Sequence, residues 1–432
     1  MKAWPVWCAL FAGSALAAPA PMPCPAGLPD GAACLNGRDS AGAFYVIALP
    51  PHWDHKVLVL HDHGGPQLGA PKLARSVADL ERWKVMVRAG YAWAGSTYHQ
   101  GGVAVRAAAE DTERLRHIVI DAIGKPRLTL LHGQSWGASV AALGTEMFPD
   151  AVDGVLLTSG VLGGGSRSYD FRLDLRVLWQ AVCHNHPRPG EPAYPLWQGL
   201  PQGSRMSRAD LDQRIDECTG LARAAAERTA EQQRHLKTLL DVVRIPERSL
   251  RGHLAWATQH FQDIAFTRLG GRDAFGNIGA RYTGSADDAA LNTQVARYRA
   301  DPAALAAFAA DTDPTGRITL PLLTVHAIDD PVAFVELESV FHDTVARAGH
   351  ADTLVQAFTA DHEHGYWSDV EYVAAVQALL AWVEHGDKPT PRALAERCLT
   401  LEPAWGATCA YRADYRPPPL DSRVAPRERQ AP

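Results

Sequence analysis

Ser135 stands in a sequence pattern that is typical of a catalytic nucleophile. It is the centre of Gly133-Gln134-Ser135-Trp136-Gly137, a G-x-S-x-G pattern that follows the apolar run 128–131. A serine on such a strand-to-helix turn is strained so that its hydroxyl projects, and the flanking glycines let the backbones pack closely. A chain with 36 glycines can contain the bare pattern by chance, so its place after a predicted strand carries the prediction.

Two glycines upstream of Ser135 can supply hydrogen-bond donors for the oxyanion that develops when a serine attacks a carbonyl. The apolar run 57–60 leads into His61-Asp62-His63-Gly64-Gly65-Pro66, where Gly64 and Gly65 would let a backbone N–H approach the substrate oxygen. The N–H of Trp136 would supply the other donor. The alternative is that these glycines form only a tight loop.

Two later segments can supply the base and the acid that a serine nucleophile needs, in the chain order acid then histidine. The run 320–326 leads into Asp329-Asp330-Pro331-Val332, and the run 354–358 leads into Asp361-His362-Glu363-His364-Gly365. Loops after parallel strands meet at one edge of the sheet. We therefore expect an aspartate of the first loop and a histidine of the second to lie near Ser135.

The elements that would position these residues alternate in the manner of βαβ units and a mostly parallel sheet. Apolar runs predict strands at 44–49, 57–60, 91–96, 128–131, 155–158, 320–326 and 354–358, and helices are expected at 72–88, 107–123, 334–348 and 370–384. The interval 161–312 has helical patterns and no convincing strand. We expect a core of 18–160 and 313–386 with 161–312 as an inserted helical cap; the alternative is an independent helical domain.

With these motifs in place, the chain resembles the α/β-hydrolase superfamily over about residues 43–160 and 315–386. The matching segments are His63-Gly64-Gly65-Pro66, Gly90-Tyr91-Ala92-Trp93-Ala94, the Ser135 pattern, Asp330-Pro331-Val332, and the His364 segment that runs on to Trp382. The resemblance implies an α/β fold with an eight-stranded, mostly parallel sheet and a triad of Ser135, Asp330 and His364.

The resemblance also favours one aspartate in the first loop and one histidine in the second. Asp330 is preferred to Asp329 because Asp-Pro-Val resembles the family loop, and His364 to His362 because it stands seven residues before Glu371, a spacing similar to that in related esterases. The His-Gly-Gly-Pro segment resembles prolyl-oligopeptidase-like members, without an amino-terminal propeller. Tannases and feruloyl esterases carry cysteines beside the serine and the histidine, where this chain has Gln134 and Gly365.

Charge and the amino-terminal residues restrict the class of protein. The net charge of −6 comes from 42 basic and 48 acidic residues with no block of one sign, so nucleic-acid binding is not expected. Residues 1–17 have the basic start, apolar run and Ala15-Leu16-Ala17 site of a signal peptide. No later run has the length of a membrane span. We therefore expect a secreted or periplasmic protein.

The cysteines agree with an oxidising compartment. Six remain after the predicted cleavage, and they form three sequence-local pairs: Cys24 with Cys34, Cys183 with Cys218, and Cys398 with Cys409. Six cysteines allow many connectivities, and local pairing is the prediction. The last pair lies in 387–432, which we expect to be a disulfide-containing extension with a polar tail.

The reaction expected is acyl transfer in two steps on a small-molecule or oligomeric carboxylic ester, without a cofactor or metal. A serine peptidase or amidase is the alternative, and an inactive binding protein is a further one. Zinc could instead be bound by the histidine pairs 61/63 and 362/364, or by the segment Cys183-His184-Asn185-His186. The full ligand pattern of a zinc site is missing. Five aromatic residues of the insertion would line an acyl pocket or belong to its core: Tyr194, Trp197, Trp256, Phe261 and Phe266.

Overall fold

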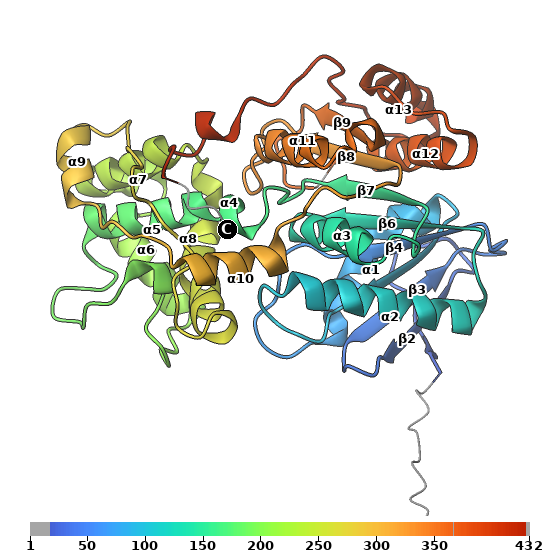
Figure 1. Ribbon diagram of the computed structural model, residues 1–432, viewed down its shortest axis with the longest axis horizontal. Coiled ribbons are helices and arrows are strands. Elements are labelled where there is room, and N and C mark those ends of the chain that lie inside the picture. The colour runs from blue at the N-terminus through green and yellow to red at the C-terminus, as the bar shows by residue number, and fades with distance from the viewer. Residues whose placement is uncertain (1–17, 366, 429–432) are drawn as a thin grey trace, which may run out of the picture.

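A single nine-stranded sheet forms the centre of the computed structural model, which describes residues 18–365 and 367–428. The predicted signal peptide, residues 1–17, lies outside the described residues. The strand order is β1-β2-β3-β5-β4-β6-β7-β8-β9 (Figure 1). Six strands run parallel to one another: β4 (Val57–Asp62), β5 (Ala92–Ser96), β6 (Leu128–Gln134), β7 (Gly154–Thr158), β8 (Leu322–Ala327) and β9 (Leu354–Thr359).

The first three strands extend the sheet in the antiparallel direction. They are β1 (Ala20–Met22), β2 (Ala33–Arg38) and β3 (Phe44–Leu49), and β3 pairs with β5. Strands β3 to β9 lie where the apolar runs predict them. Strand β1 adds a ninth strand to the eight expected. It has three residues, contains Pro21 and pairs only at the sheet edge, where proline is tolerated and apolar patterning is weak.

Helices cover both faces of the sheet and make three layers. Helices α1 (Leu73–Arg88), α12 (Asp369–His385) and α13 (Pro391–Trp405) pack their apolar side chains against one face. Helices α2 (Val105–Ile123), α3 (Trp136–Met147) and α11 (Leu337–Arg347) pack against the other. The four helices predicted from spacing are therefore confirmed. The fold is the α/β-hydrolase fold, as the resemblance implies.

Helices α4 to α10 separate β7 from β8 and lie together on the left of the view in Figure 1. They are α4 (Gly165–Ser168), α5 (Asp170–Cys183), α6 (Arg208–Thr219), α7 (Ala230–Val243), α8 (Leu250–Ala255), α9 (Asp288–Gln294) and α10 (Pro302–Thr312). A capping box of Thr229 and Gln232 begins α7. The proposed domain boundaries, and the role of 161–312 as a cap, stay predictions.

Three disulfides join the predicted local pairs: Cys24–Cys34, Cys183–Cys218 and Cys398–Cys409. The last pair ties α13 to the segment that follows it. Beyond it, the chain crosses from the sheet to the helical insertion, where Arg427 pairs with Asp174 (Figure 1). None of the helices in the described part of the chain is both long and apolar enough to span a membrane.

Candidate active site

Ser135 occupies a sharp turn between β6 and α3. Its backbone has φ 59° and ψ −121°, a conformation that non-glycine residues rarely adopt. A Cβ on Gly133 would lie 2.5 Å from the carbonyl oxygen of Gly137, and a Cβ on Gly137 would overlap the carbonyl oxygen of Asp62. Close backbone packing thus requires glycine at both positions, as expected from the G-x-S-x-G pattern.

His364 joins Ser135 to Asp330 through both of its ring nitrogens. Its Nε2 lies 2.7 Å from Ser135 Oγ, and its Nδ1 lies 2.8 Å from Asp330 Oδ2 and 3.0 Å from Oδ1. Ser135 is 7% exposed and Asp330 is 1% exposed. A base within hydrogen-bond reach of a serine, oriented by a buried carboxylate, is the arrangement that activates a hydroxyl nucleophile.

The alternative pair of residues lies elsewhere on the surface. His362 Nδ1 is 3.0 Å from Asp329 Oδ2, and their side chains are 72% and 61% exposed. Within the described residues they pair with one another, and neither side chain hydrogen-bonds to Ser135. The geometry therefore favours Asp330 and His364 over their neighbours in each loop.

Asp330 is held by the turn that follows β8. Its Oδ1 accepts hydrogen bonds from the N–H groups of Val332 and Ala333, at 2.8 and 2.9 Å. Burial by itself would raise the pKa of Asp330, but His364, His326 and the Val332 N–H stabilise the anion and lower the pKa below its usual value. The carboxylate is therefore charged when it faces the His364 ring.

A second buried histidine lies behind Asp330. His326 Nδ1 is 3.0 Å from Glu338 Oε1, and His326 Nε2 is 2.9 Å from the carbonyl oxygen of Ala333 and 3.6 Å from Asp330 Oδ2. Thr324 and Gln356 donate to the other oxygen of Glu338, so Glu338 accepts on both sides. Both nitrogens of His326 therefore face oxygen atoms that can accept, an arrangement that favours the protonated ring. Burial opposes that charge, yet Glu338 and Asp330 raise the pKa of His326.

Gly64, one of the predicted oxyanion donors, lies directly beside Ser135. A Cβ on Gly64 would lie 2.9 Å from Ser135 Cβ, so the Gly64 backbone runs directly against the serine. Within the described residues, no group accepts a hydrogen bond from the N–H of Gly64, Gly65 or Trp136. These three N–H groups are therefore available to a ligand.

Arg75 fixes the loop that carries Gly64. Its guanidinium donates to the carbonyl oxygen of Gly64 and, at 3.1 Å, to His63 Nδ1, while its Nε pairs with Asp79 at 3.1 Å. Arg75 could not be predicted from the sequence, because nothing in a helix-forming stretch shows which side chain turns back towards a distant loop.

The His364 loop is held by Arg82 and Gln134. Arg82 donates to the carbonyl oxygens of His364 and Gly365, at 3.2 and 2.9 Å, and Gln134 Nε2 lies 3.3 Å from His364 Nε2. A Cβ on Gly365 would lie 2.8 Å from Gln134 Nε2. The two positions that hold cysteines in tannases thus face one another here, and the Gln134 amide fills the space between them.

The histidine pairs considered as zinc ligands do not converge. His61 Nδ1 lies 3.1 Å from His132 Nδ1 inside the sheet, whereas His362 is on the surface and His364 contacts Ser135. Burial lowers the pKa of His63 and of His132 to about 3. These rings are therefore neutral parts of the packing beneath the Gly64 loop.

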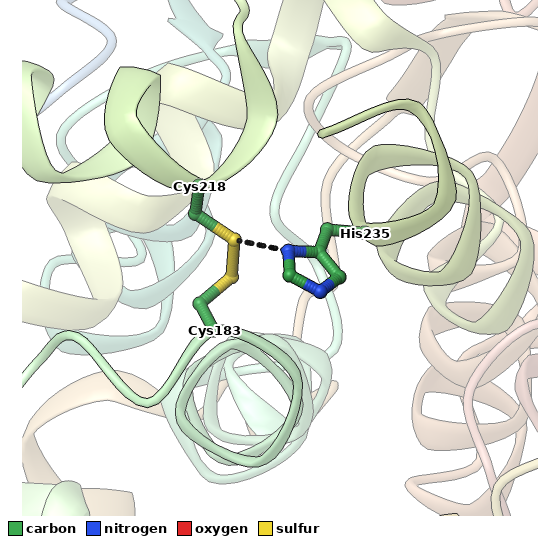
Figure 2. A group of neighbouring side chains, drawn as sticks. All are labelled: Cys183, Cys218 and His235. Carbon is green, nitrogen blue, oxygen red and sulfur yellow. Dashed lines mark hydrogen bonds between the residues drawn. A yellow bond between two sulfur atoms is a disulfide. The ribbon is translucent and has the colours of Figure 1, made fainter. Parts of the chain in front are cut away.

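In the described part of the chain, one group of three potential metal ligands comes together: Cys183, Cys218 and His235 (Figure 2). The two cysteines form a disulfide, and His235 Nδ1 lies 3.4 Å from Cys218 Sγ. Zinc binds thiolates, which a disulfide does not offer. His186, from the same sequence motif, is instead buried against Arg176 and Tyr194.

Two aromatic residues of the insertion, Phe261 and Trp256, lie in different environments. Phe261 is fully buried and stacks on Phe275, as a core residue does. Trp256 is partly buried and stacks on His260 with ring centres 4.0 Å apart, and it also contacts Tyr169.

The sheet order, the serine turn after β6 and the loops after β8 and β9 define an α/β-hydrolase fold with a candidate serine-histidine-aspartate site. No protein-family model matches the sequence, and neither does any curated protein. Solved structures similar to this chain include feruloyl esterase B from Aspergillus oryzae, with 13% identity, 86% of each chain covered and a TM-score of 0.44.

Two further structures show the same level of similarity. An esterase from Exiguobacterium antarcticum has 15% identity and a TM-score of 0.36, with 81% of this chain and 98% of that chain covered. Puromycin hydrolase has 15% identity and a TM-score of 0.39, with 84% of this chain and 39% of that chain covered. At these values the description of the fold rests on the strand order and connections of this chain itself.

Proposed function

We propose that this protein is a serine hydrolase that cleaves carboxylic esters through an acyl-enzyme intermediate. The observation that carries the proposal is the hydrogen-bonded chain from Ser135 through His364 to the buried Asp330. It is supported by the N–H groups of Gly64, Gly65 and Trp136, which have no acceptor within the described residues, because an oxyanion needs fixed donors where its charge develops.

In the first step, Ser135 Oγ bonds to the carbonyl carbon of the ester while its proton passes to His364 Nε2. The N–H groups of Gly64, Gly65 and Trp136 receive the oxyanion, and Asp330 stabilises the imidazolium. Collapse of the tetrahedral intermediate breaks the ester C–O bond, and His364 returns the proton to the leaving alcohol. The acyl group then remains on Ser135.

In the second step, water attacks the acyl carbon and gives a proton to His364. The second tetrahedral intermediate expels Ser135 Oγ, which recovers the proton, and the carboxylic acid leaves. An ester is proposed rather than an amide because an ester carbonyl is less stabilised by resonance and an alkoxide leaves more readily than an amide anion, so the same groups suffice without further anchoring of a peptide.

The three disulfides also support a secreted or periplasmic location, since such bonds persist in oxidising compartments. Expression with the amino-terminal segment intact should yield an exported protein that begins near Ala18. Sequencing of its amino terminus checks this, and an uncleaved protein retained in the cytoplasm would contradict it.

The catalytic proposal is tested with the purified mature chain, a fluorophosphonate probe and a panel of short p-nitrophenyl esters and aminoacyl amides. Ester hydrolysis and labelling of Ser135 are expected. Ser135→Ala should abolish both while the melting temperature stays close to that of the wild type. Activity that survives this substitution but is lost with a chelator would indicate a metal hydrolase, and amide turnover without ester preference would overturn the choice of ester.

A further inference from the structure

Helix α5 places a buried arginine, Arg172, among three aromatic rings. Arg172 is 3% exposed, and its guanidinium carbon lies 4.5 Å from the ring centre of Trp256, 4.7 Å from that of Tyr169 and 5.0 Å from that of Phe171. These distances are those of cation–π contacts. The guanidinium is therefore enclosed by ring faces rather than by water.

Arg172 has no acidic partner in the part of the chain that the structure describes. No carboxylate lies within ion-pair distance, and its buried Nε and Nη1 have no hydrogen-bond acceptor. Burial lowers the pKa of Arg172 to about 10, and only the Tyr169 hydroxyl acts against this. Burial of a guanidinium without an anion costs free energy, so such a residue is a candidate for binding one.

Two other arginines near Arg172 are buried and have polar partners, one from the C-terminal extension and one from the insertion. Arg427 pairs with Asp174 at 2.5 Å. Arg176, one turn beyond Arg172 on α5, donates to the carbonyl oxygen of His186 at 2.7 Å and to the Tyr194 hydroxyl at 2.9 Å. Within the described residues, Nε and Nη1 of Arg176 also lack an acceptor, so Arg172 differs from Arg176 in its closer packing against three ring faces and in its influence on His253.

The ring of His253 connects Arg172 to the candidate active site. His253 Nε2 donates to the carbonyl oxygen of Pro331, the residue after Asp330, at 2.9 Å. Burial and the charge of Arg172 lower the pKa of His253 to about 3, and the charges of Asp330 and His364 act on the same ring. Arg172 and two members of the triad are therefore close enough to the same imidazole for their charges to act on it.

Phe171 gives a second path to the same place. Its ring centre is 4.8 Å from that of His253 and 4.4 Å from that of Phe334, which is four residues after Asp330. The aromatic wall around Arg172 is thus continuous with the loop that carries the catalytic acid.

We propose that Arg172 binds a free carboxylate of the substrate, so that the preferred esters carry an anionic group at one end and the scissile ester at the other. Tyr169, Phe171 and Trp256 would contact the apolar or aromatic part between the two groups. This inference rests on the proposed ester hydrolysis and adds a substrate class to it.

A carboxylate would supply the acceptors that Arg172 lacks. A bidentate arginine–carboxylate contact in a site with little water is stronger than a neutral hydrogen bond. An uncharged amide of the same shape offers one acceptor and no charge. We expect the carboxylate to be preferred by about tenfold to hundredfold.

The binding test uses the Ser135→Ala chain, which cannot turn over a substrate, with benzoate and benzamide as a matched pair in calorimetric titrations. Benzoate should bind more tightly than benzamide, and Arg172→Gln should remove the difference. Arg172→Lys keeps the charge but loses the planar guanidinium that can donate two hydrogen bonds to a carboxylate, so it should retain part of the benzoate preference. Arg176→Gln is the matched control from the same helix and should leave the benzoate preference unchanged.

The kinetic test compares kcat/KM within two pairs of esters in the protein with Ser135 intact. One pair has the anion on the alcohol side, para-carboxyphenyl acetate against para-carbamoylphenyl acetate. The other has it on the acyl side, monomethyl terephthalate against methyl para-carbamoylbenzoate. At least one carboxylate should be preferred about tenfold or more, and Arg172→Gln should abolish that preference.

The outcomes separate this inference from the proposed function. Hydrolysis of all four esters without charge preference, or a preference unchanged by Arg172→Gln, would overturn the arginine subsite and leave the hydrolase intact. Absence of hydrolysis together with Arg172-dependent benzoate binding would overturn ester hydrolysis and support the anion site. If Arg172→Gln fails to fold, the wild-type comparison within each pair still decides, because equal rates and equal binding contradict the subsite.

Discussion

At the scale of single residues, the candidate site depends on which member of each adjacent pair is buried. Asp330 accepts two backbone N–H groups and faces His364, whereas its neighbour Asp329 bonds to an exposed histidine. Because these aspartates are adjacent in the turn after β8, one side chain faces the protein interior and the other faces solvent. The Asp330 carboxylate can therefore orient His364, whereas the Asp329 carboxylate forms only an exposed ion pair.

Asp330→Asn should lower kcat by about a thousandfold to ten-thousandfold, because the amide cannot stabilise the imidazolium and favours the wrong tautomer of His364. Asp329→Asn is the matched control, and it should change kcat by less than about threefold, since an exposed ion pair contributes little. Steady-state kinetics on p-nitrophenyl acetate checks both variants. Equal losses in the two variants would show that the acid has been assigned wrongly.

His326→Gln should change how stability depends on pH. The folded-state pKa of His326 is raised above the ordinary value of about 6.5, so its charged form stabilises the fold below that value. This contribution is lost as pH rises through the folded-state pKa. The difference in unfolding free energy between wild type and variant should therefore be largest near pH 6 and shrink at higher pH. Urea unfolding at several pH values measures it, and a constant difference would contradict the charged state of His326.

At the scale of elements, the sequence was sufficient for those parts that local patterns determine. Strands β3 to β9 are short apolar runs bounded by turn residues, and the Ser135 turn follows one of them. Strand β2 escaped prediction because it mixes Asn36 and Gly37 with only one buried residue, Cys34. Its pairing with β3, rather than its own composition, makes it a strand.

The parts of the site that could not be predicted depend on tertiary contacts. Arg75, His326 and Arg172 each lie in an ordinary stretch of strand or helix, and their importance comes from a partner, or the lack of one, far away in sequence. The local cysteine pairs were predictable because each pair is separated by few residues relative to the chain.

The Cys183–Cys218 disulfide should contribute to the stability of the insertion, because it joins the end of α5 to α6. Replacement of both cysteines by alanine should lower the unfolding free energy by about 2–4 kcal/mol, through the freer unfolded chain. Denaturant unfolding of the double variant measures this. Replacement of both Cys24 and Cys34, which close a shorter loop at the sheet edge, is the comparison, and a larger loss there would contradict the expectation.

At the scale of the whole molecule, the segment after α13 returns from the sheet to the helical insertion, where it forms a buried ion pair. Arg427 donates to Asp174 Oδ2 at 2.5 Å, and both side chains are almost fully buried. The Tyr282 hydroxyl also donates to Asp174, at 2.7 Å. One carboxylate on α5 is thus shared by the end of the chain and by the insertion, so the position of α5, and with it of Arg172, depends on this contact.

Arg427→Ala should therefore lower the unfolding free energy by about 3–5 kcal/mol, since it leaves the buried Asp174 without its cation. Arg299→Ala is the matched control: Arg299 pairs with Glu428 beside the same segment, but their side chains are 57% and 60% exposed. Exposed pairs contribute at most about 1 kcal/mol, so this variant should unfold almost like the wild type. Because α5 carries Arg172, Arg427→Ala should also weaken the benzoate preference more than the neutral esterase rate. Equal stability of the two variants would mean that the end of the chain does not hold the insertion in place.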